Sequence, residues 1–318
     1  MSNGNSFIPK TIWIFWYQGI SNAPFVVRGC IDSWVKENPG WEVVVLDKDN
    51  LAEYVVLALP NEKLADISLT KQSNLVRLQL LSQYGGVWAD STTLCMRPLD
   101  DWIDDCSTSG FFAFCNPGRD RIISSWFMAC EKECPIVLKW RERYVSFFMK
   151  NNFNINGRFK QRIIKGLSKI LNRSEKTTRY WISPLVTKLI RVYPYFVFHY
   201  MFETLVSNDS ECQIIWNNTK KISHRPYPKK IGGLFSPLNE NIKNEIDARN
   251  SPTYKLTWKY DHSKYSPSSV LYYLLEGRHE DDLLRREQRG SSLPLLDAQA
   301  SWHAGRFLTC LTALARAL

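Results

Sequence analysis

The first part of the chain alternates short apolar runs with segments whose apolar residues recur at helical spacing. Residues 11–17 (TIWIFWY) predict a buried strand, residues 24–37 a helix, and residues 41–46 (WEVVVL) a second strand. A strand, a helix and a strand in this order favour a right-handed crossover within a parallel sheet. The pattern therefore predicts an α/β domain that begins with a βαβ unit.

The most informative pattern lies in residues 73–98. An apolar helical face is supplied by four leucines, Leu75, Leu78, Leu80 and Leu81. The glycine pair at 85–86 is expected to end this helix, and residues 87–88 predict a short core strand. Asp90 then emerges at the carboxyl end of that strand, where α/β sheets commonly bind their ligands.

Asp90 admits two interpretations. A carboxylate followed by hydroxyl side chains at Ser91 and Thr92 could hold a divalent cation or a sugar hydroxyl. The same residues could instead form a strand-to-loop turn that Asp90 caps. Spacing alone favours these two interpretations about equally.

The remaining pattern extends the domain. Further helices are expected over 51–59, 121–148 and 193–206, and further strands over 110–114 and 251–260. Pro135 is expected to divide the segment 121–148 into two helices. We expect one domain over 1–277, followed by a tail at 278–318 to which the sequence assigns no role.

A basic segment, residues 158–179, forms the core of a predicted helical insertion at about 150–180. It carries eight lysines and arginines against one acid, Glu175, and its apolar residues recur at helical spacing. Such a helix is typical of peripheral contact with an anionic membrane, but ordinary solvated helices have the same pattern. Both interpretations stay open.

Composition and charge narrow the partners only in part. The 318 residues include 12 tryptophans and 14 tyrosines, which suit contact with sugars, bases or lipid interfaces. The net charge of +10 favours an anionic partner without identifying it. Eight cysteines without a CxxC pair, together with a start that lacks a secretory pattern, favour reduced thiols in a cytoplasmic protein.

Several short sequence blocks follow one another in a characteristic order between residues 8 and 260. They are residues 8–13 (IPKTIW) with Trp16 and Gly19, Ser73 with Arg77, residues 84–90 (YGGVWAD), and the segments 125–127, 195–202 and 254–259. In order and spacing they resemble the bacterial capsular polysaccharide synthesis family of glycosyltransferases. That family is related to sugar transferases that carry a DXD motif.

The resemblance implies a GT-A-like fold, a Rossmann-type mixed sheet flanked by helices, with the helical insertion added. It also implies a hexosyltransferase-like enzyme that uses a nucleotide-sugar donor, expected to be a UDP-sugar, with Mn²⁺ or Mg²⁺ as cofactor. The transfer is expected to retain the anomeric configuration. The expected acceptor is a polysaccharide or a lipid-linked saccharide at the inner face of the plasma membrane.

The resemblance further assigns roles to single residues. Asp90 would begin the DXD-like motif, Arg77 would lie near the donor phosphates or sugar, and both are the candidate catalytic residues. Trp16 would stack on the base, and Trp258 would cover the phosphates. The candidate donor-binding set is completed by Gln18, Ser73, Asn74 and Lys259.

Two positions depart from the family pattern. Thr92 stands where a second aspartate is usual, so the candidate metal ligands are Asp90 and the weaker Thr92. Asn74 stands where relatives often have an acid.

Two alternatives to an enzyme stay open. One is a basic protein that binds nucleic acid or a membrane surface, and the other is a catalytically inactive transferase-fold scaffold. No nucleic acid is expected as partner, because the longest basic run is confined to one predicted helix.

Overall fold

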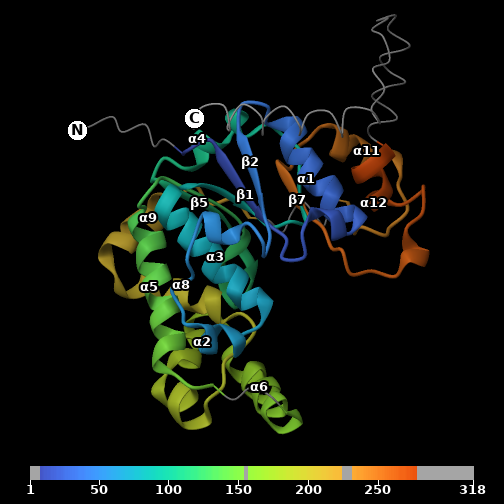
Figure 1. Ribbon diagram of the computed structural model, residues 1–318. Helices are drawn as coiled ribbons and strands as arrows, with labels where there is room; N and C mark the ends of the chain where they lie inside the picture. Colours follow the sequence, from blue (N-terminus) through green and yellow to red (C-terminus); the bar gives the residue numbers. More distant parts are fainter. Residues whose placement is uncertain (1–7, 154–156, 224–230, 278–318) are drawn as a thin grey trace, which may run out of the picture. The chain divides into compact units, whose positions relative to one another are not determined.

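The computed structural model describes residues 8–153, 157–223 and 231–277 (Figure 1). One compact unit comprises Met1–Leu275, and Glu276–Leu318 forms another. The predicted tail lies outside the described residues, and the domain boundary stays a prediction. The sheet and the residues of the candidate site all belong to the first unit.

A five-stranded mixed sheet forms the centre of this unit, in the order β2-β1-β3-β6-β5. Its strands are β1 (Thr11–Phe15), β2 (Glu42–Leu46), β3 (Gly86–Ala89), β5 (Phe111–Gly118) and β6 (Arg121–Cys130). β1 runs parallel to both β2 and β3, whereas β6 runs antiparallel to β3 and to β5. The expected βαβ start and the mixed sheet flanked by helices are confirmed.

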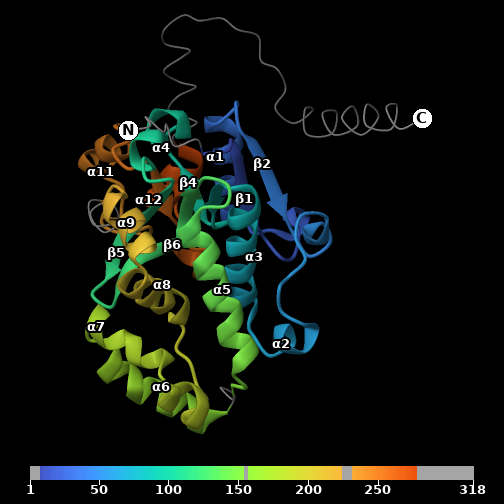
Figure 2. The ribbon, with the colours of Figure 1, turned by 90° about the vertical axis from the view of Figure 1, so that its left-hand side faces the viewer.

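Helices connect and cover these strands (Figures 1 and 2). The helices are α1 (Phe25–Glu37), α2 (Asn61–Ala65), α3 (Leu69–Tyr84), α4 (Ile103–Cys106), α5 (Pro135–Lys150), α6 (Arg158–Leu171), α7 (Glu175–Thr178), α8 (Val197–Asn208), α9 (Ser210–Asn218), α11 (Glu240–Asp247) and α12 (Val270–Tyr272). Single turns or short irregular helices occur at Ile20–Asn22, Leu51–Glu53, Leu99–Asp101, Arg179–Ile182, Leu185–Ile190, His262–Lys264 and Tyr273–Gly277. In Figure 2, α3 and α5 run side by side.

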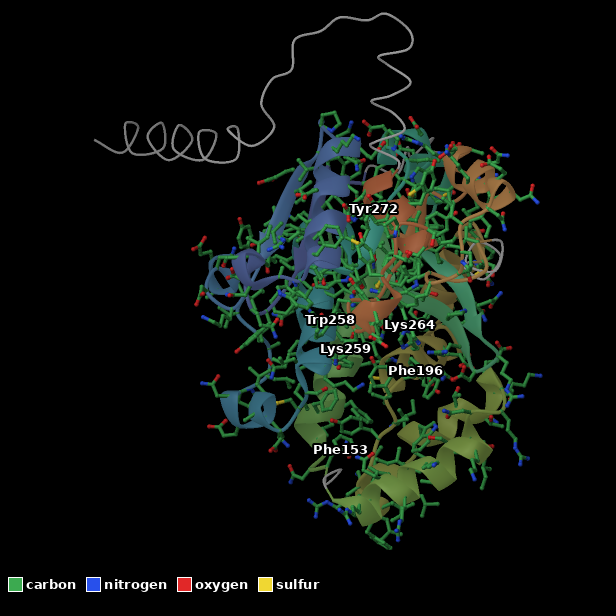
Figure 3. All side chains as sticks on the ribbon, turned by 90° about the vertical axis from the view of Figure 1, so that its right-hand side faces the viewer. Phe153, Phe196, Trp258, Lys259, Lys264 and Tyr272 are labelled. Atoms are coloured by element: carbon green, nitrogen blue, oxygen red, sulfur yellow. The ribbon has the colours of Figure 1, made fainter. Side chains whose placement is uncertain are left out.

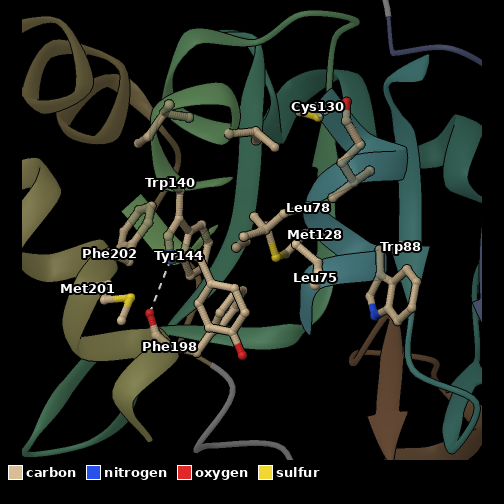
Figure 4. Packing of buried hydrophobic residues seen from close by; sticks show 14 of the residues in the cluster. Leu75, Leu78, Trp88, Met128, Cys130, Trp140, Tyr144, Phe198, Met201 and Phe202 are labelled. Atoms are coloured by element: carbon tan, nitrogen blue, oxygen red, sulfur yellow. Dashed lines mark hydrogen bonds between the residues drawn. The ribbon is translucent and has the colours of Figure 1, made fainter. Parts of the chain in front are cut away.

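Successive strand residues point to opposite faces of the sheet, and both of these faces are buried. On one face Trp13 and Trp88 pack with leucines of α3 and aromatic residues of α5 and α8, as Figure 4 shows for part of this cluster. On the other face Ile12 and Val87 pack against α1. Covered faces leave the carboxyl edge of the parallel strands as the place where polar side chains can meet a ligand.

A glycine pair joins α3 to β3, as predicted. Gly85 and Gly86 have φ angles of +68° and +89°, which side chains other than glycine rarely adopt. A Cβ atom at Gly86 would lie 2.6 Å from the carbonyl oxygen of Thr11. The pair therefore lets the chain turn sharply from the helix into the centre of the sheet.

A separate two-stranded antiparallel ribbon lies beyond the end of β3. It pairs β4 (Thr93–Cys95) with β7 (Thr253–Lys255), and Thr93 lies opposite Lys255. The backbone N–H of Leu256 also donates to the carbonyl of Thr92 at 2.8 Å. This ribbon carries residues from late in the chain to the segment that follows Asp90.

Two predicted helices are wrong in part. Residues 121–130 form strand β6 instead of a helix, and Pro135 occupies the first turn of α5 instead of separating two helices. Residues 51–59 form only the turn Leu51–Glu53, because the Gln79 side chain binds the backbone there. Its amide donates to the carbonyl of Val56 at 2.6 Å and accepts from the N–H of Ala58 at 3.0 Å.

The predicted basic helix forms in part: α6 ends at Leu171, and the short α7 begins separately with Ser174 as its N-cap. Ile164, Leu167 and Leu171 on α6 pack against a small core around Trp181 and Tyr200, so part of the apolar face is covered by the chain itself. Phe159 nevertheless remains 72% exposed. In the described part of the chain, none of the helices combines the length and apolar character needed to span a bilayer.

Candidate active site

The site begins at the carboxyl edge of two neighbouring parallel strands. Because Trp13 on β1 pairs with Trp88 on β3, both strands end at the same edge, and Trp16 and Asp90 follow there. The backbone N–H of Asp90 donates to the carbonyl of Trp126 at 2.8 Å. The central strands therefore hold the backbone of the candidate carboxylate.

Arg77 reaches this edge from α3. Its guanidinium Nη2 donates to Asp90 Oδ1 at 2.7 Å, and Nη1 donates to Asn74 Oδ1 at 3.2 Å. The guanidinium also lies over the Trp88 ring, 4.8 Å from its centroid. The Arg77 side chain is only 4% exposed, so this buried charge is stabilised by the Asp90 carboxylate and an aromatic face.

The ribbon β4–β7 brings a third charged side chain to the same place. Lys255 Nζ donates to Asp90 Oδ2 at 2.9 Å and to the Thr92 hydroxyl at 2.7 Å. Trp88 Nε1 donates to the other carboxylate oxygen at 2.9 Å. Both Asp90 oxygens are thus bound by protein donors.

These contacts decide the ionisation of Asp90. Burial would raise the pKa of its carboxyl, but the Lys255 ammonium, the Arg77 guanidinium and the Trp88 hydrogen bond outweigh burial and hold that pKa below its usual range. Burial also lowers the pKa of Arg77, and Asp90 opposes that shift. The site therefore contains a carboxylate anion between two cations.

Two tryptophans border the charged group. Trp16 and Trp258 meet edge to face, with ring centroids 5.4 Å apart and an interplanar angle of 89°. Trp258 is 40% exposed, and Lys259 Nζ lies 4.9 Å from the Trp258 ring centroid. Figure 3 shows Trp258 and Lys259 next to each other. The indole N–H of Trp16 is buried and has no hydrogen-bond partner among the described residues.

Except for Asn74, these side chains line one cleft of about 470 Å³. The described residues that line it are Phe15, Trp16, Tyr17, Gln18, Leu69, Thr70, Ser73, Arg77, Trp88, Asp90, Ser91, Thr92, Lys255, Trp258 and Lys259. Among them Arg77, Lys255 and Lys259 are cationic, and Asp90 is the one acid. A cleft with an excess of positive charge and exposed aromatic surface is suited to a ligand that joins an anionic group to a planar ring.

The cleft gathers nearly every residue that the sequence nominated. Trp16, Gln18 and Ser73 line it together with the catalytic candidates and with Trp258 and Lys259. Asn74 does not line it and instead binds Arg77, which makes it a positioning residue for the guanidinium. The roles of these residues stay predictions, although their convergence on one cleft is now a structural observation.

Sequence reasoning missed Lys255. The residue lies in a block that carries the family resemblance, but the block alone did not connect it with Asp90, which is 165 positions away. A pairing between β4 and β7 would have been needed to place Thr93 opposite Lys255. Each strand has only three residues, which is too short for a register to be predicted from sequence.

The site residues do not fit the divalent cation that the resemblance implies. Asp90 and Thr92 were the candidate ligands, and Lys255 Nζ is hydrogen-bonded to both of them. No cluster of three or more His, Cys, Asp or Glu side chains that could hold a metal occurs in the described ranges. Mn²⁺ and Mg²⁺ favour carboxylate and other oxygen ligands, whereas this site offers one carboxylate whose oxygens are already bound.

Comparisons with known proteins show which proteins the chain is similar to. The chain is 28% identical over 178 residues to the O-glycosyltransferase braB of Annulohypoxylon truncatum. This match covers 50% of this chain and 42% of that protein. It is 36% identical over 103 residues to the glycosyltransferase afumC of Aspergillus fumigatus. That match covers 29% of this chain and 26% of that protein. The chain thus spans less than half the length of these curated relatives.

A solved structure and a family model complete the comparison. The UDP-bound glycosyltransferase domain from the YGT toxin aligns with a TM-score of 0.39 and 10% identity, over 91% of this chain and 93% of that chain. The model of a family described as "Capsular polysaccharide synthesis protein" matches residues 2–183. Because this match covers more than half of the 318 residues, the chain belongs to the capsular polysaccharide synthesis protein family.

Proposed function

We propose that the protein transfers a sugar from a nucleoside diphosphate sugar, expected to be a UDP-sugar, to a hydroxyl group of an acceptor. The observation that carries this proposal is the cleft in which Trp16 and Trp258 lie beside the charged group of Arg77, Asp90 and Lys255. Aromatic surface and clustered cations match the two chemically different halves of such a donor. The similarity to fungal glycosyltransferases supports the same function.

In this proposal the base of the donor lies against Trp16. Stacking of a base on an aromatic face is worth about 1–3 kcal/mol and tolerates different bases. The edge-to-face contact with Trp258 restricts the orientation of the Trp16 ring, so less conformational freedom is lost on binding. The diphosphate would then lie towards Arg77 and Lys255.

The transfer breaks the bond between the sugar C1 and an oxygen of the diphosphate. The electron pair stays on that oxygen, while the acceptor oxygen forms the new bond to C1. Cations fixed near the departing oxygen stabilise the charge that develops there, and mutational losses at such sites reach about 100-fold or more. Arg77 is fixed before the donor arrives, because Asp90 and Asn74 already bind its guanidinium.

We further propose that the transfer retains the anomeric configuration. An inverting reaction needs a general base that removes the proton of the acceptor hydroxyl. Asp90, the acid among the described lining residues, is poorly suited to this role because Arg77, Trp88 and Lys255 bind its oxygens and its pKa is lowered. In a retaining front-face reaction the departing diphosphate accepts that proton. Proton NMR of the first product formed distinguishes the two anomers.

The acceptor is proposed to be a capsular or other surface polysaccharide, or its lipid-linked precursor, at the cytoplasmic face of the plasma membrane. The family supports a polysaccharide acceptor. Peripheral membrane contact is supported by α6, where the exposed Phe159 lies between Arg158 and Lys160 at the start of the helix.

A donor screen tests the proposed function. Purified protein is incubated with a panel of nucleoside diphosphate sugars, with and without Mn²⁺, and release of the nucleoside diphosphate is measured. We expect release from at least one donor, and a loss of about 100-fold or more in Asp90→Asn. Asp49→Asn is the matched control, because the Asp49 side chain is 77% exposed and outside the cleft. Full turnover by a folded Asp90→Asn protein would contradict the proposal. If no donor is turned over but calorimetry shows that uridine diphosphate binds, the catalytically inactive transferase-fold scaffold is favoured.

A further inference from the structure

The ammonium group of Lys255 lies where a divalent cation would have to bind. Lys255 Nζ is 2.9 Å from Asp90 Oδ2 and 2.7 Å from the Thr92 hydroxyl, and these two residues were the candidate metal ligands. A Mg²⁺ ion would need to approach the same oxygens to about 2.1 Å. The ion and the ammonium group therefore compete for one position.

The charges of the site favour the ammonium group over an ion. Asp90 contributes one negative charge, and Arg77 and Lys255 contribute one positive charge each, so the three groups together carry +1. A divalent cation next to these groups would be repelled by both side chains, since Arg77 Nη2 lies 2.7 Å from the same carboxylate. The excess positive charge that a metal usually supplies is already present in the chain.

We propose that Lys255 takes the part of the divalent cation, so that the protein binds the donor diphosphate and transfers the sugar without a metal. This inference rests on the proposed function. A lysine ammonium has three N–H donors, and Asp90 and Thr92 accept two of them. The third is available to a ligand, because Lys255 lines the cleft.

The step is the same bond exchange with a different stabilising charge. The bond from C1 to the diphosphate oxygen breaks with its electron pair on that oxygen, and the acceptor oxygen bonds to C1. The acceptor proton passes to the released diphosphate. Lys255 keeps its proton throughout and stabilises the departing oxygen by a charge-assisted hydrogen bond. Asp90 and Thr92 position the ammonium group and do not hold an ion.

The test compares the wild-type protein in EDTA and in Mn²⁺. Donor turnover and calorimetric binding of uridine diphosphate are measured under both conditions. We expect both quantities to agree within about twofold, because the stabilising charge belongs to the chain. Activity or binding that appears only with Mn²⁺ would overturn the inference and leave the proposed function intact. Absence of turnover and of binding under both conditions would instead refute the proposed function.

Variants at position 255 provide the second arm. In EDTA, Lys255→Met is expected to lower turnover by about 100-fold and affinity for uridine diphosphate by about tenfold, with Lys255→Arg restoring part of both. Lys264→Met is the matched control, because Lys264 is exposed and does not line the cleft. Thermal unfolding confirms that each variant is folded. Equal affinity in folded Lys255→Met and wild type would overturn the inference.

Discussion

At the scale of single residues, the site is built from side chains whose polar groups hold one another before a ligand arrives. Asp90 binds both Arg77 and Lys255, and Asn74 accepts a hydrogen bond from the guanidinium. Such preorganisation lowers the cost of fixing charges when a diphosphate binds. The two tryptophans of the cleft have fewer contacts with the rest of the chain than these charged groups. Trp258 is 40% exposed, and the Trp16 N–H is unpaired among the described residues.

Substitution of Trp16 tests the aromatic side. We expect Trp16→Ala to weaken binding of uridine diphosphate by about 10-fold to 100-fold, and Trp16→Phe to restore most of that affinity, because a phenyl ring still presents a face to the base. Calorimetry measures both variants against wild type. Trp126→Phe is a control, because Trp126 lies outside the lining of the cleft. Unchanged affinity in Trp16→Ala would exclude base stacking at this position.

Glu203 gives a residue-scale prediction about pH. Burial raises the pKa of its carboxyl to about 7, a hydrogen bond from Thr178 at 3.0 Å opposes the shift, and Glu175 adds to it. The native state therefore binds more protons than the unfolded state between the ordinary pKa of 4.5 and about 7. Stability from this group is present at low pH and is lost as the pH rises through that window.

We expect this group to lower the free energy of unfolding by about 1 kcal/mol between pH 5 and pH 8, after allowance for partial exposure. Urea unfolding at both pH values measures the change. Glu203→Gln should be less sensitive to pH than wild type by that amount. An identical pH dependence in the two proteins would refute the assignment.

At the scale of elements, the sequence predicted what local pattern determines. The helix at 69–84, the glycine turn and the strand that ends before Asp90 follow from apolar spacing and from residues that favour turns. The run RIISSWFMAC at 121–130 forms strand β6 although the sequence predicts a helix there. β6 lies between β3 and β5 and is buried on both faces, so no alternating polar face marks it as a strand.

The glycine turn can be tested by a matched pair of substitutions. Gly86→Ala would force a Cβ atom to within 2.6 Å of the Thr11 carbonyl oxygen at a φ of +89°, and should lower the free energy of unfolding by about 2 kcal/mol or more. Gly40→Ala should change it by less than about 0.5 kcal/mol, because nothing lies within 4 Å of the added methyl. Equal effects, measured by urea unfolding, would contradict the role of the turn.

The membrane contact proposed for α6 belongs to this scale as well. Phe159→Ser should weaken partitioning to vesicles of phosphatidylcholine and phosphatidylglycerol by about tenfold, because a phenyl ring no longer leaves water. Ile214→Ser on α9 is the control, since Ile214 is 61% exposed on a helix without the basic cluster. If both variants partition like wild type in a sedimentation assay, α6 is an ordinary solvated helix.

At the scale of the whole molecule, the fold connects three distant segments at one sheet edge. Trp16 follows β1, Asp90 follows β3, and Lys255 ends β7, which reaches the site only through its pairing with β4. The first two positions could be predicted, because strand order and the resemblance both point to the carboxyl edge. The position of Lys255 depends on a tertiary pairing between two short strands, and no local pattern in the sequence predicts that pairing.

The central claim is that one cleft binds a nucleotide, with its base at Trp16 and its diphosphate at Lys255. The most direct measurement is calorimetric titration of wild type, Trp16→Ala and Lys255→Met with uridine diphosphate, uridine and pyrophosphate. We predict that Trp16→Ala loses affinity for uridine but not for pyrophosphate, that Lys255→Met shows the reverse, and that both lose affinity for uridine diphosphate. Wild-type affinity for uridine diphosphate in both variants, or failure of pyrophosphate to compete with it, would contradict the claim.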